Sequence, residues 1–311
     1  MTAAPSFAAF HARWAAPVEQ ALRELLPPAA TAPARLHEAM HYALFPGGKR
    51  LRPMLALLGC EAVGGDPQAA LRAAAAIECL HTYSLVHDDL PCMDDDDLRR
   101  GRPTCHKVFG EALALLAGDA LLTVAFEGAA SAGGAAVAAL ARGAGSLGMV
   151  GGQVEDLAAE GDPAGHTLAR LQWIHDHKTG ALITASLLVG AHAAAGPAGA
   201  PAAVTAPLGR YGDLLGRAFQ IADDCLDLTG TAAELGKNPL ADVALGKLTW
   251  PALVGLEQSL AAARATAADA RAMAVVVGRA VAAWRGSGAA ALDAAVGLLQ
   301  DVADYAVERR R

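Results

Sequence analysis

Apolar residues recur at helical spacing along almost the whole chain, and this pattern restricts the fold more than any other feature. Several of the stretches are apolar nearly all round, as helices inside a large bundle are. No repeat, linker or shift in composition marks a boundary, so we predict one all-α domain over residues 1–311 with ten or more helices. The expected helices are Ser6–Leu26, Ala34–Leu44, Pro53–Val63, Gln68–Asp89, Lys107–Ala130, Ala135–Asp156, His166–Ala194, Val204–Leu228, Trp250–Ser259 and two C-terminal helices that end near Arg311.

The composition agrees with a helical interior. Hydrophobic residues make up 54% of the chain, aromatic residues 5% and charged residues 18%. Ala and Leu, which dominate the hydrophobic fraction, are strong helix formers, whereas the residues that favour strands are comparatively scarce. The net charge of −7 argues against a nucleic-acid partner, because such a surface needs a clustered excess of Lys and Arg.

Neither a membrane span nor an oxidising compartment is indicated. The longest uncharged stretch, Ala181–Gly209, contains Gly and Pro from Gly190 onward, so it is a poor candidate for a span. Met1–Phe10 lacks the basic start and apolar run of a signal peptide. The five cysteines are scattered, odd in number and without a C-x-x-C pair, so we expect a reduced, cytoplasmic protein.

A first acidic cluster follows an apolar helix at Asp88, Asp89 and Asp94. Unpaired carboxylates are costly to bury, so they call for solvent, a cation or a metal. Asp88 and Asp94 are six residues apart, roughly 240° around a regular helix, but Pro91 disrupts the ladder and allows Asp94 to turn back toward Asp88. A solvated acidic loop is the alternative, whereas a calcium loop is excluded by the missing Gly and closing Glu.

A second acidic cluster lies on another apolar helix at Asp223, Asp224 and Asp227. Asp223 and Asp227 are four residues apart and therefore project from one face. Carboxylates side by side repel each other, and burial strengthens that repulsion. A divalent cation removes it, and Mg²⁺ prefers oxygen ligands with room for water and phosphate. Two such clusters on apolar helices indicate a multi-metal diphosphate site.

Basic residues that suit phosphate stand near these clusters. Gly48, Lys49 and Arg52 belong to a Gly-rich turn that opens a helix, where backbone N–H groups and cations favour anions, although the turn is no nucleotide P-loop. Taken singly, each basic residue is equally well read as an ordinary surface charge. A zinc site at His175 and His177 is disfavoured, because residues two apart do not share a helix face. The other candidate cations are Arg99, Arg100, Lys178, Lys237 and Lys247.

Through these motifs the chain resembles the trans-isoprenyl diphosphate synthases, and in particular the bacterial farnesyl diphosphate synthases. The likeness spans most of the chain, and the combination is specific although no single piece is. It rests on the segments Gly47–Pro53, Asp88–Asp94 with Leu98–Gly101, Lys178–Gly180, Phe219–Gln220, Asp223–Asp227 and Gly246–Pro251.

The resemblance implies helices around a central cavity, a homodimer and Mg²⁺ ions, three per active site. The metals would be held by Asp88, Asp94 and Asp223, with Asp89, Asp224 and Asp227 in support. Arg99, Lys178 and Lys237 would bind the allylic diphosphate, and Gly48, Lys49, Arg52, His81 and Arg100 would bind isopentenyl diphosphate. Lys247 would also bind substrate. Thr179 and Gln220 would lie near the allylic cation that forms when the diphosphate departs.

The activity implied by the likeness is condensation of isopentenyl diphosphate with dimethylallyl or geranyl diphosphate to give farnesyl diphosphate. Bacterial farnesyl synthases tend to carry an aromatic residue where Tyr83 stands, so Tyr83 would close the product tunnel while the small Ser84 leaves room beneath the diphosphate. The alternatives are a geranyl or geranylgeranyl diphosphate synthase and, from a different class, a non-catalytic helical partner subunit. A class I terpene cyclase fits less well, because its second metal motif differs from Asp223-Asp224-x-x-Asp227.

Overall fold

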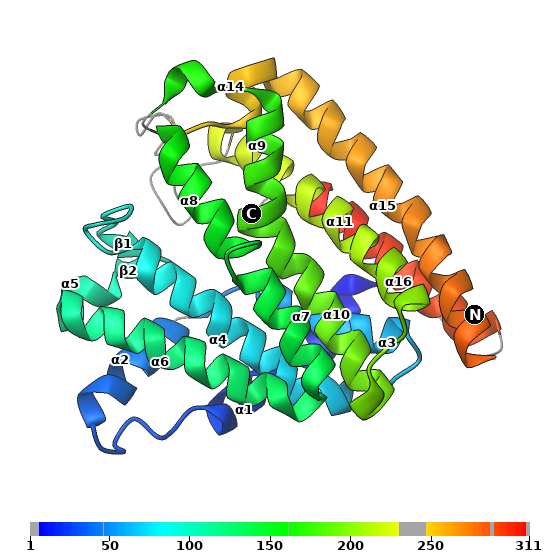
Figure 1. The fold of residues 1–311 in the computed structure, drawn as a ribbon, viewed down its shortest axis with the longest axis horizontal. Coiled ribbons are helices and arrows are strands. Elements are labelled where there is room, and N and C mark those ends of the chain that lie inside the picture. The colour runs from blue at the N-terminus through cyan, green and yellow to red at the C-terminus, as the bar shows by residue number, and fades with distance from the viewer. Residues whose placement is uncertain (1–5, 46, 161, 230–246, 287–288, 309–311) are drawn as a thin grey trace.

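The computed structural model describes residues 6–45, 47–160, 162–229, 247–286 and 289–308, and nearly all of them lie in helices or short connections (Figure 1). The all-α prediction is confirmed, with more than ten helices. The α-helices are α1 Phe7–Leu25, α2 Ala34–Leu44, α3 Leu51–Ala62, α4 Leu71–Asp88, α5 Cys105–Phe109, α6 Glu111–Ala129, α7 Gly134–Ala144, α8 Met149–Glu160, α9 Leu168–Ile174, α10 Ala181–Ala195, α11 Ala202–Thr229, α14 Trp250–Val254, α15 Leu256–Arg285 and α16 Ala289–Glu308.

Shorter elements connect these helices. A π-helix over His175–Gly180 joins α9 to α10 without a break in the helical path. Strands β1 (Leu98–Arg99) and β2 (Arg102–Pro103) form an antiparallel hairpin that pairs Arg99 with Arg102. Turns of 3₁₀-helix cover Pro67–Ala70, Ala130–Ala132, Pro163–Gly165 and Gly196–Ala198.

Two of the expected helices are interrupted at glycines with positive φ. The helix expected over Lys107–Ala130 ends at Phe109, and α6 begins after Gly110, whose φ is 87°. The helix expected over Trp250–Ser259 stops at Val254, and Gly255, with φ 84°, starts the long α15. Such φ values are costly for residues with a Cβ, so glycine allows the chain to change direction there. Apolar spacing continues across both breaks, and periodicity alone therefore misses them.

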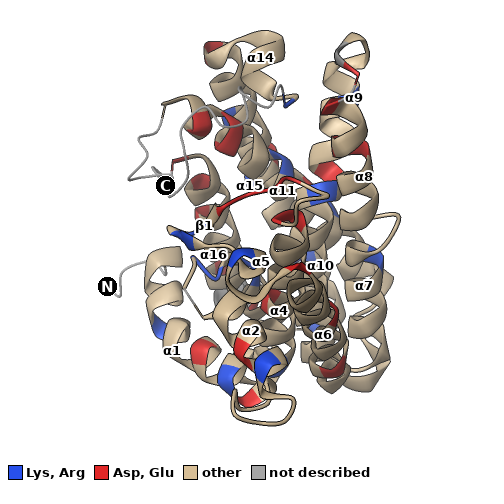
Figure 2. Cartoon of the chain, turned by 90° about the vertical axis from the view of Figure 1, so that its left-hand side faces the viewer, with Lys and Arg blue, Asp and Glu red and all other residues tan. Residues whose placement is uncertain are grey.

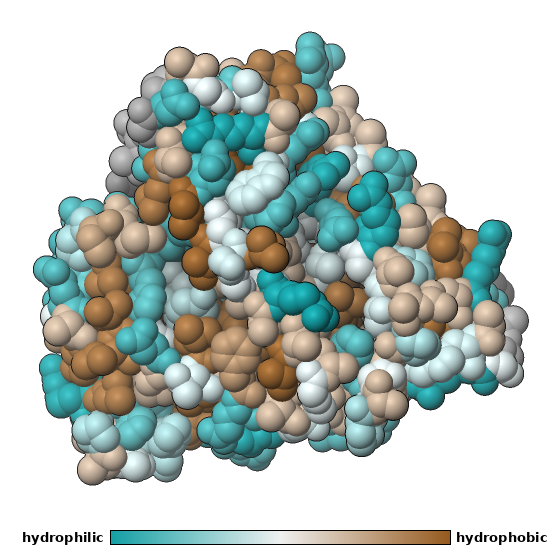
Figure 3. All heavy atoms as spheres, in the orientation of Figure 1, coloured by the Kyte–Doolittle hydropathy of each residue, from teal (hydrophilic) through white to brown (hydrophobic). Residues whose placement is uncertain are grey.

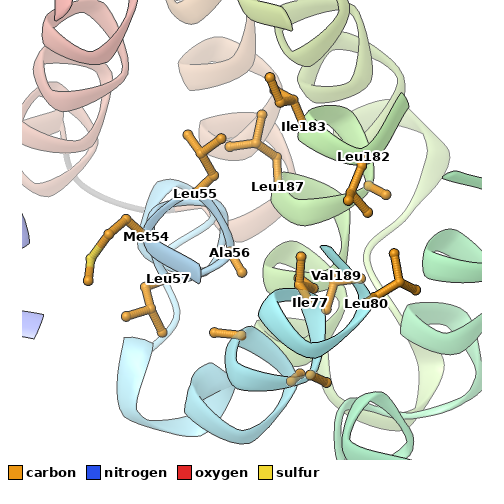
Figure 4. Packing of buried hydrophobic residues seen from close by; sticks show 14 of the residues in the cluster. Met54, Leu55, Ala56, Leu57, Ile77, Leu80, Leu182, Ile183, Leu187 and Val189 are labelled. Carbon is orange, nitrogen blue, oxygen red and sulfur yellow. The ribbon is translucent and has the colours of Figure 1, made fainter. Parts of the chain in front are cut away.

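The main hydrophobic core lies where α3, α4 and α10 pack together (Figure 4). Leu55 of α3, Ile77 of α4 and Leu187 of α10 are all fully buried. Residues 73–76 of α4 are four consecutive buried alanines, and their small side chains let neighbouring helices approach closely. A second apolar cluster, which includes Ile221 of α11 and Trp250 of α14, packs around the C-terminal half of α11.

Two helical stretches, Glu111–Ala132 and Leu168–Ala198, are long and apolar enough to cross a bilayer by length and composition alone. Of their most apolar windows, 39% and 50% respectively are buried inside the fold. Core helices of soluble proteins meet the same criterion, so these two stretches are weak evidence for membrane spans.

Candidate active site

The first acidic cluster turns back on the end of α4, as the sequence predicts. Helix α4 ends at Asp88, and the main-chain N–H of Asp94 donates to the carbonyl oxygen of Asp88 at 2.8 Å. A second bond, from the N–H of Asp95 to the carbonyl of Leu90 at 3.2 Å, closes the loop around Pro91. The two acidic residues that a regular helix would separate therefore lie together.

The Asp88 carboxyl is in an environment that disfavours its charge. Burial raises its pKa to about 6, and the charges of Asp94 and Asp89 add to the rise although Lys178 and Arg99 oppose it. A divalent cation would reverse this balance, because it favours the ionised carboxylate.

Asp89 and Arg99 form a buried ion pair that anchors the hairpin. Arg99 donates to Oδ1 of Asp89 from Nε at 2.8 Å and from Nη2 at 2.5 Å, and it also reaches Oδ2 of Asp96 at 2.9 Å. Asp89 is only 3% exposed. Its carboxylate thus holds β1 against α4, with Arg99 close enough to influence Asp88.

The second acidic cluster lines a cavity of about 150 Å³ between α11, the π-helix and the segment before α14. Acidic and basic segments lie side by side in the middle of the molecule, between β1 and α8, and others are spread over the remaining helices (Figure 2). The charged and polar residues that line the cavity are Asp156, His175, Lys178, Thr179, Gln220, Asp223, Asp224, Asp227, Lys247 and Thr249. The structure therefore brings Asp223, Asp224 and Asp227 into one cavity with Lys178, Thr179 and Gln220, which the sequence placed in the same site.

Asp224 is fastened by hydrogen bonds within this cavity. Its Oδ1 accepts from Nε2 of Gln220 at 3.1 Å, and its Oδ2 accepts from the main-chain N–H of Trp250 at 2.8 Å. Nε2 of His175 lies 3.4 Å from the same Oδ2. Gln220 in turn accepts from the hydroxyl of Thr179 at 2.8 Å. The Asp224 side chain therefore connects α11 to α14 and, through Gln220, fixes Thr179.

The π-helix separates two sets of contacts. Lys178 points to the cavity, where Nζ lies 2.5 Å from Oδ2 of Asp156, whereas Asp176 pairs with Arg217 at 3.0 and 2.6 Å. The wider π turn lets neighbouring residues point differently from those of a regular α-helix, and π turns are frequent at functional sites. His175 is buried and His177 stacks on the exposed Trp173 at 3.8 Å, so the two histidines do not converge on one metal.

Lys178 and Lys247 supply positive charge between the two acidic clusters. Burial opposes the charge of Lys178, but Asp156 and Asp88 more than compensate, so the pKa of Lys178 is raised. Nζ of Lys247 lies 3.5 Å from Asp94 and 3.8 Å from Glu160. Lys237, expected in the same group, lies outside the described residues.

A separate basic cluster forms where α3, α4 and the hairpin meet. Burial lowers the pKa of Arg52 to about 10, and the Nε–H of Arg52 is buried with no hydrogen-bond partner among the described residues. The pKa of His81 is well below its usual value, mainly because the side chain is buried. The positive charges of Arg52 and Arg100 lower this pKa further. A Cβ on Gly48 would lie 2.8 Å from Nη1 of Arg100, so the glycine lets the guanidinium cross the turn. Neighbouring Lys49 is engaged in an interaction of its own.

The two residues expected to control product length lie one turn above the acidic end of α4. Tyr83 is 6% exposed, and its ring packs edge-on against His87 at 5.6 Å. Nε2 of His87 lies 3.0 Å from the carbonyl oxygen of Leu115 in α6, which places this face of α4 against α6. The hydroxyl of Ser84 is half-buried and donates to the carbonyl oxygen of His81 at 2.8 Å.

Sequence reasoning missed several residues of the site. Asp156 and His175 contact Lys178 and Asp224 but stand in no recognisable motif. Glu78 could have been found from the sequence, because it is the lone carboxylate within the apolar run 73–80. The structure buries it against Arg50. A lone charge inside an apolar helix requires a buried partner.

The donor set fits Mg²⁺ although no preformed cage exists. Among the described residues, no three His, Cys, Asp or Glu side chains are close enough to hold an ion by themselves. Mg²⁺ usually takes only one or two carboxylates and completes its shell with water and substrate phosphate. The mutually repelling carboxylates at the end of α4 meet that requirement.

A family model described as polyprenyl synthetase matches residues 33–276. Among curated proteins, the chain is 46% identical over 263 residues to geranylgeranyl pyrophosphate synthase 12, chloroplastic, from Arabidopsis thaliana, covering 81% of this chain and 71% of that one. It is 48% identical over 238 residues to the heterodimeric geranylgeranyl pyrophosphate synthase large subunit 1, chloroplastic, of the same plant. That match covers 73% of this chain but 63% of the relative, which is less than two thirds of its length.

Solved structures match over nearly the whole chain. An FPP/GFPP synthase from Zymomonas mobilis superposes with a TM-score of 0.79 at 37% identity, over 96% of this chain and 98% of that one. A geranyltransferase from Helicobacter pylori, complexed with magnesium and isoprenyl diphosphate, gives a TM-score of 0.73 at 31% identity, over 89% of this chain and 96% of that one.

Proposed function

Because the chain belongs to the polyprenyl synthetase family, we propose that it is a prenyltransferase that joins isopentenyl diphosphate to an allylic diphosphate. The observation that carries this proposal is that basic side chains stand in two separate groups, each of which would suit an anion. One lies between the acidic clusters, where Lys178 and Lys247 stand, and the other is the basic cluster of Arg52, His81 and Arg100. Two diphosphate substrates need two such sites.

Magnesium belongs to the first site in this proposal. Asp88, Asp94 and Asp223 would hold the ions, whose positive charge stabilises a departing diphosphate. The Helicobacter pylori protein is a relative in complex with magnesium. Asp224 would support these ions from its place beside Asp223, where bonds from Gln220 and from the Trp250 N–H fix its carboxylate.

The chain's own residues would bind and orient the substrates. Lys178 and Arg99 would contact the allylic diphosphate, and they favour negative charge as it develops on that group. The Thr179 hydroxyl and the Gln220 carboxamide, fixed by Asp224, would present dipoles to the allylic carbon atoms. The apolar helices that carry these residues would exclude water when both substrates are bound, because water would otherwise quench the carbocation.

We propose a product of twenty carbons. The farnesyl product expected from the motif resemblance is not supported by the curated relatives, which are mainly geranylgeranyl diphosphate synthases. A fifteen-carbon product is the second candidate, because the Tyr83 ring is buried on the face of α4 below Asp88. The Zymomonas mobilis relative is an FPP/GFPP synthase, so product length varies among similar chains.

A homodimer is supported by apolar side chains that remain exposed. Leu115 and Leu116 of α6, together with Leu147, Val150 and Val154 in and before α8, are exposed in the single chain. Brown surface follows α5 and α6 in Figure 3. Exposed apolar patches of this kind mark protein contacts, and a second copy of the chain is the partner we propose.

Incubation of the purified protein with Mg²⁺, isopentenyl diphosphate and dimethylallyl diphosphate tests the proposal. Chromatography of the products should give a main peak of twenty carbons, with no product when the metal is chelated. A main peak of fifteen carbons would favour the second candidate. Absence of any condensation with dimethylallyl, geranyl or farnesyl diphosphate would favour a non-catalytic partner subunit instead.

A further inference from the structure

Glu78 is a buried carboxylate that none of the roles above uses. It lies on α4 and is 2% exposed. Its Oε1 lies 3.0 Å from Nη1 of Arg50 and 4.0 Å from Nη2 of Arg100. Its charge also reaches Arg52. One carboxylate therefore faces three guanidinium groups, two of which belong to the basic cluster.

Arg50 anchors this arrangement to the rest of the fold. It is 4% exposed and stands at the start of α3 with φ 47°, a conformation that costs energy for a residue with a side chain. Its Nε donates to Glu19 of α1 at 2.6 Å, and its Nη2 donates to the carbonyl oxygen of Leu44 in α2 at 2.9 Å. With the bond to Glu78, a single guanidinium connects α1, α2, α3 and α4. Arg50 is therefore fixed by several helices, and its bond to Glu78 fixes the position of that carboxylate.

Arg100 is the less buried partner, with 25% of its side chain exposed. It lies on the hairpin turn, where it donates to the carbonyl oxygen of Gly47 and crosses over Gly48. Burial lowers the pKa of Arg100, and Arg50 and Arg99 repel it, while the charge of Glu78 favours its protonated form. Without the Glu78 charge, Arg50, Arg52 and Arg100 would repel one another at short range, and the long Arg100 side chain would be free to turn toward solvent.

The structure assigns Glu78 the role of a positioning residue, whose carboxylate sets Arg52 and Arg100 in place for isopentenyl diphosphate before that substrate binds. This inference rests on the proposed function, because it assigns the basic cluster to one of the two substrates. A diphosphate that meets cations already in position does not have to order them, and preorganisation of this kind increases affinity. Glu78 itself contacts no substrate.

The test compares Glu78→Gln with the wild-type enzyme. The glutamine keeps the size of the side chain but not its charge. We expect KM for isopentenyl diphosphate to rise roughly tenfold or more, as loss of a charged contact does, while KM for the allylic substrate changes less than about twofold. Glu127→Gln is the matched control, because Glu127 forms an exposed pair with Arg72 at 3.1 Å, and it should change neither KM. Equal rises for both substrates would overturn the inference.

A second variant covers the case in which Glu78→Gln does not fold. The double variant Arg50→Met/Glu78→Leu removes both buried charges together, and apolar replacement of a buried ion pair often preserves stability. It should fold, as judged by circular dichroism, and still show the raised KM for isopentenyl diphosphate. A double variant with an unchanged KM would show that Glu78 only stabilises the fold.

Direct binding separates this inference from the proposed function. In EDTA the first site has no metal in either protein, so a difference between wild type and Glu78→Gln in calorimetry with inorganic diphosphate reports on the basic cluster. Wild-type protein should bind diphosphate at least about tenfold more tightly than Glu78→Gln. That difference would support the positioning role even if the wild-type enzyme condensed none of the substrates tested, and equal affinities would refute it even in an active enzyme.

Discussion

The carbonyl oxygen of Asp88 accepts a hydrogen bond from the main-chain N–H of Asp94 at 2.8 Å, across the loop that contains Pro91. This bond brings the two acidic residues to the same end of α4, where the charge of Lys178 acts on Asp88 and Nζ of Lys247 lies 3.5 Å from Asp94. The geometry makes α4 the common support of the site. Glu78 and His81 of the same helix face the basic cluster, about three and about two turns before Asp88 respectively.

Removal of either acidic cluster should abolish turnover. Asp88→Ala and Asp223→Ala should each lower kcat by at least about a hundredfold, because the charge that stabilises the departing diphosphate is lost. Steady-state kinetics measures the change, and circular dichroism should show an unchanged helical content. Asp269→Ala on the exposed face of α15 is the control and should be fully active. Near-normal rates in Asp88→Ala would refute a metal site at the end of α4.

The requirement for Mg²⁺ should depend on pH through Asp88. Its pKa of about 6 in the metal-free protein means that the carboxyl is protonated below that pH, and the ion has to displace the proton. The Mg²⁺ concentration that gives half-maximal activity should therefore rise as the pH falls below about 6 and be constant above it. Titrations of activity with Mg²⁺ from pH 5 to pH 8 measure this. A half-saturating concentration that is independent of pH would contradict the assignment.

The same pKa predicts how the metal-free protein melts. A raised pKa means that the folded state binds more protons than the unfolded chain between the ordinary pKa of 3.8 and about 6. The contribution of Asp88 to stability therefore falls as the pH rises through that window. In EDTA, Tm should fall less steeply with rising pH in Asp88→Asn than in the wild-type protein, and Mg²⁺ at pH 8 should raise Tm of the wild type only.

The two basic groups should act on different substrates. Arg52→Ala should raise KM for isopentenyl diphosphate, and Lys178→Ala should raise KM for the allylic substrate, because each removes a charged contact worth about 1.5–3 kcal/mol. Initial rates with one substrate varied and the other saturating give the two constants. If both variants affected both substrates equally, the residues would not belong to separate sites.

The sequence predicted well those features that depend on residues close together along the chain. The helical class, the limits of α2 and the turn at Pro91 follow from apolar spacing and from what proline does to a helix. The breaks at Gly110 and Gly255 were missed, because apolar residues continue on both sides of each glycine.

The missing parts of the site depend on contacts between distant segments. The sequence predicts Asp224 as support for metals but gives no sign of its bond from the Trp250 N–H, which lies 26 residues further along the chain. Nothing in the local sequence distinguishes Arg50 from the other cations of its turn, but the packing of α1, α2 and α4 turns its side chain inward. Tertiary packing decides which ion-pair partner a charged side chain has. The local sequence does not contain this information.

Product length should depend on Tyr83 and Ser84. In the proposed function the growing chain would run from a diphosphate at Asp88 toward the N-terminus of α4, and Tyr83 lies about 7.5 Å along that axis at 1.5 Å per residue. Burial raises the pKa of Tyr83 to about 12, with a further rise from the charge of Asp88. The phenol therefore lies in an apolar environment within reach of the acidic end of the helix.

Replacement of these two residues should shift the product in opposite directions. Tyr83→Ala opens space on the α6 side of α4 and should lengthen the main product by at least one five-carbon unit relative to the wild-type enzyme. Ser84→Phe fills the space beneath the diphosphate and should shorten it. Chromatography of the products measures both, and Tyr305→Ala, which removes an aromatic ring packed on Phe7 near the chain's end, is a control that should keep the wild-type length. An unchanged product in Tyr83→Ala would place the end of the tunnel on another helix or across the dimer.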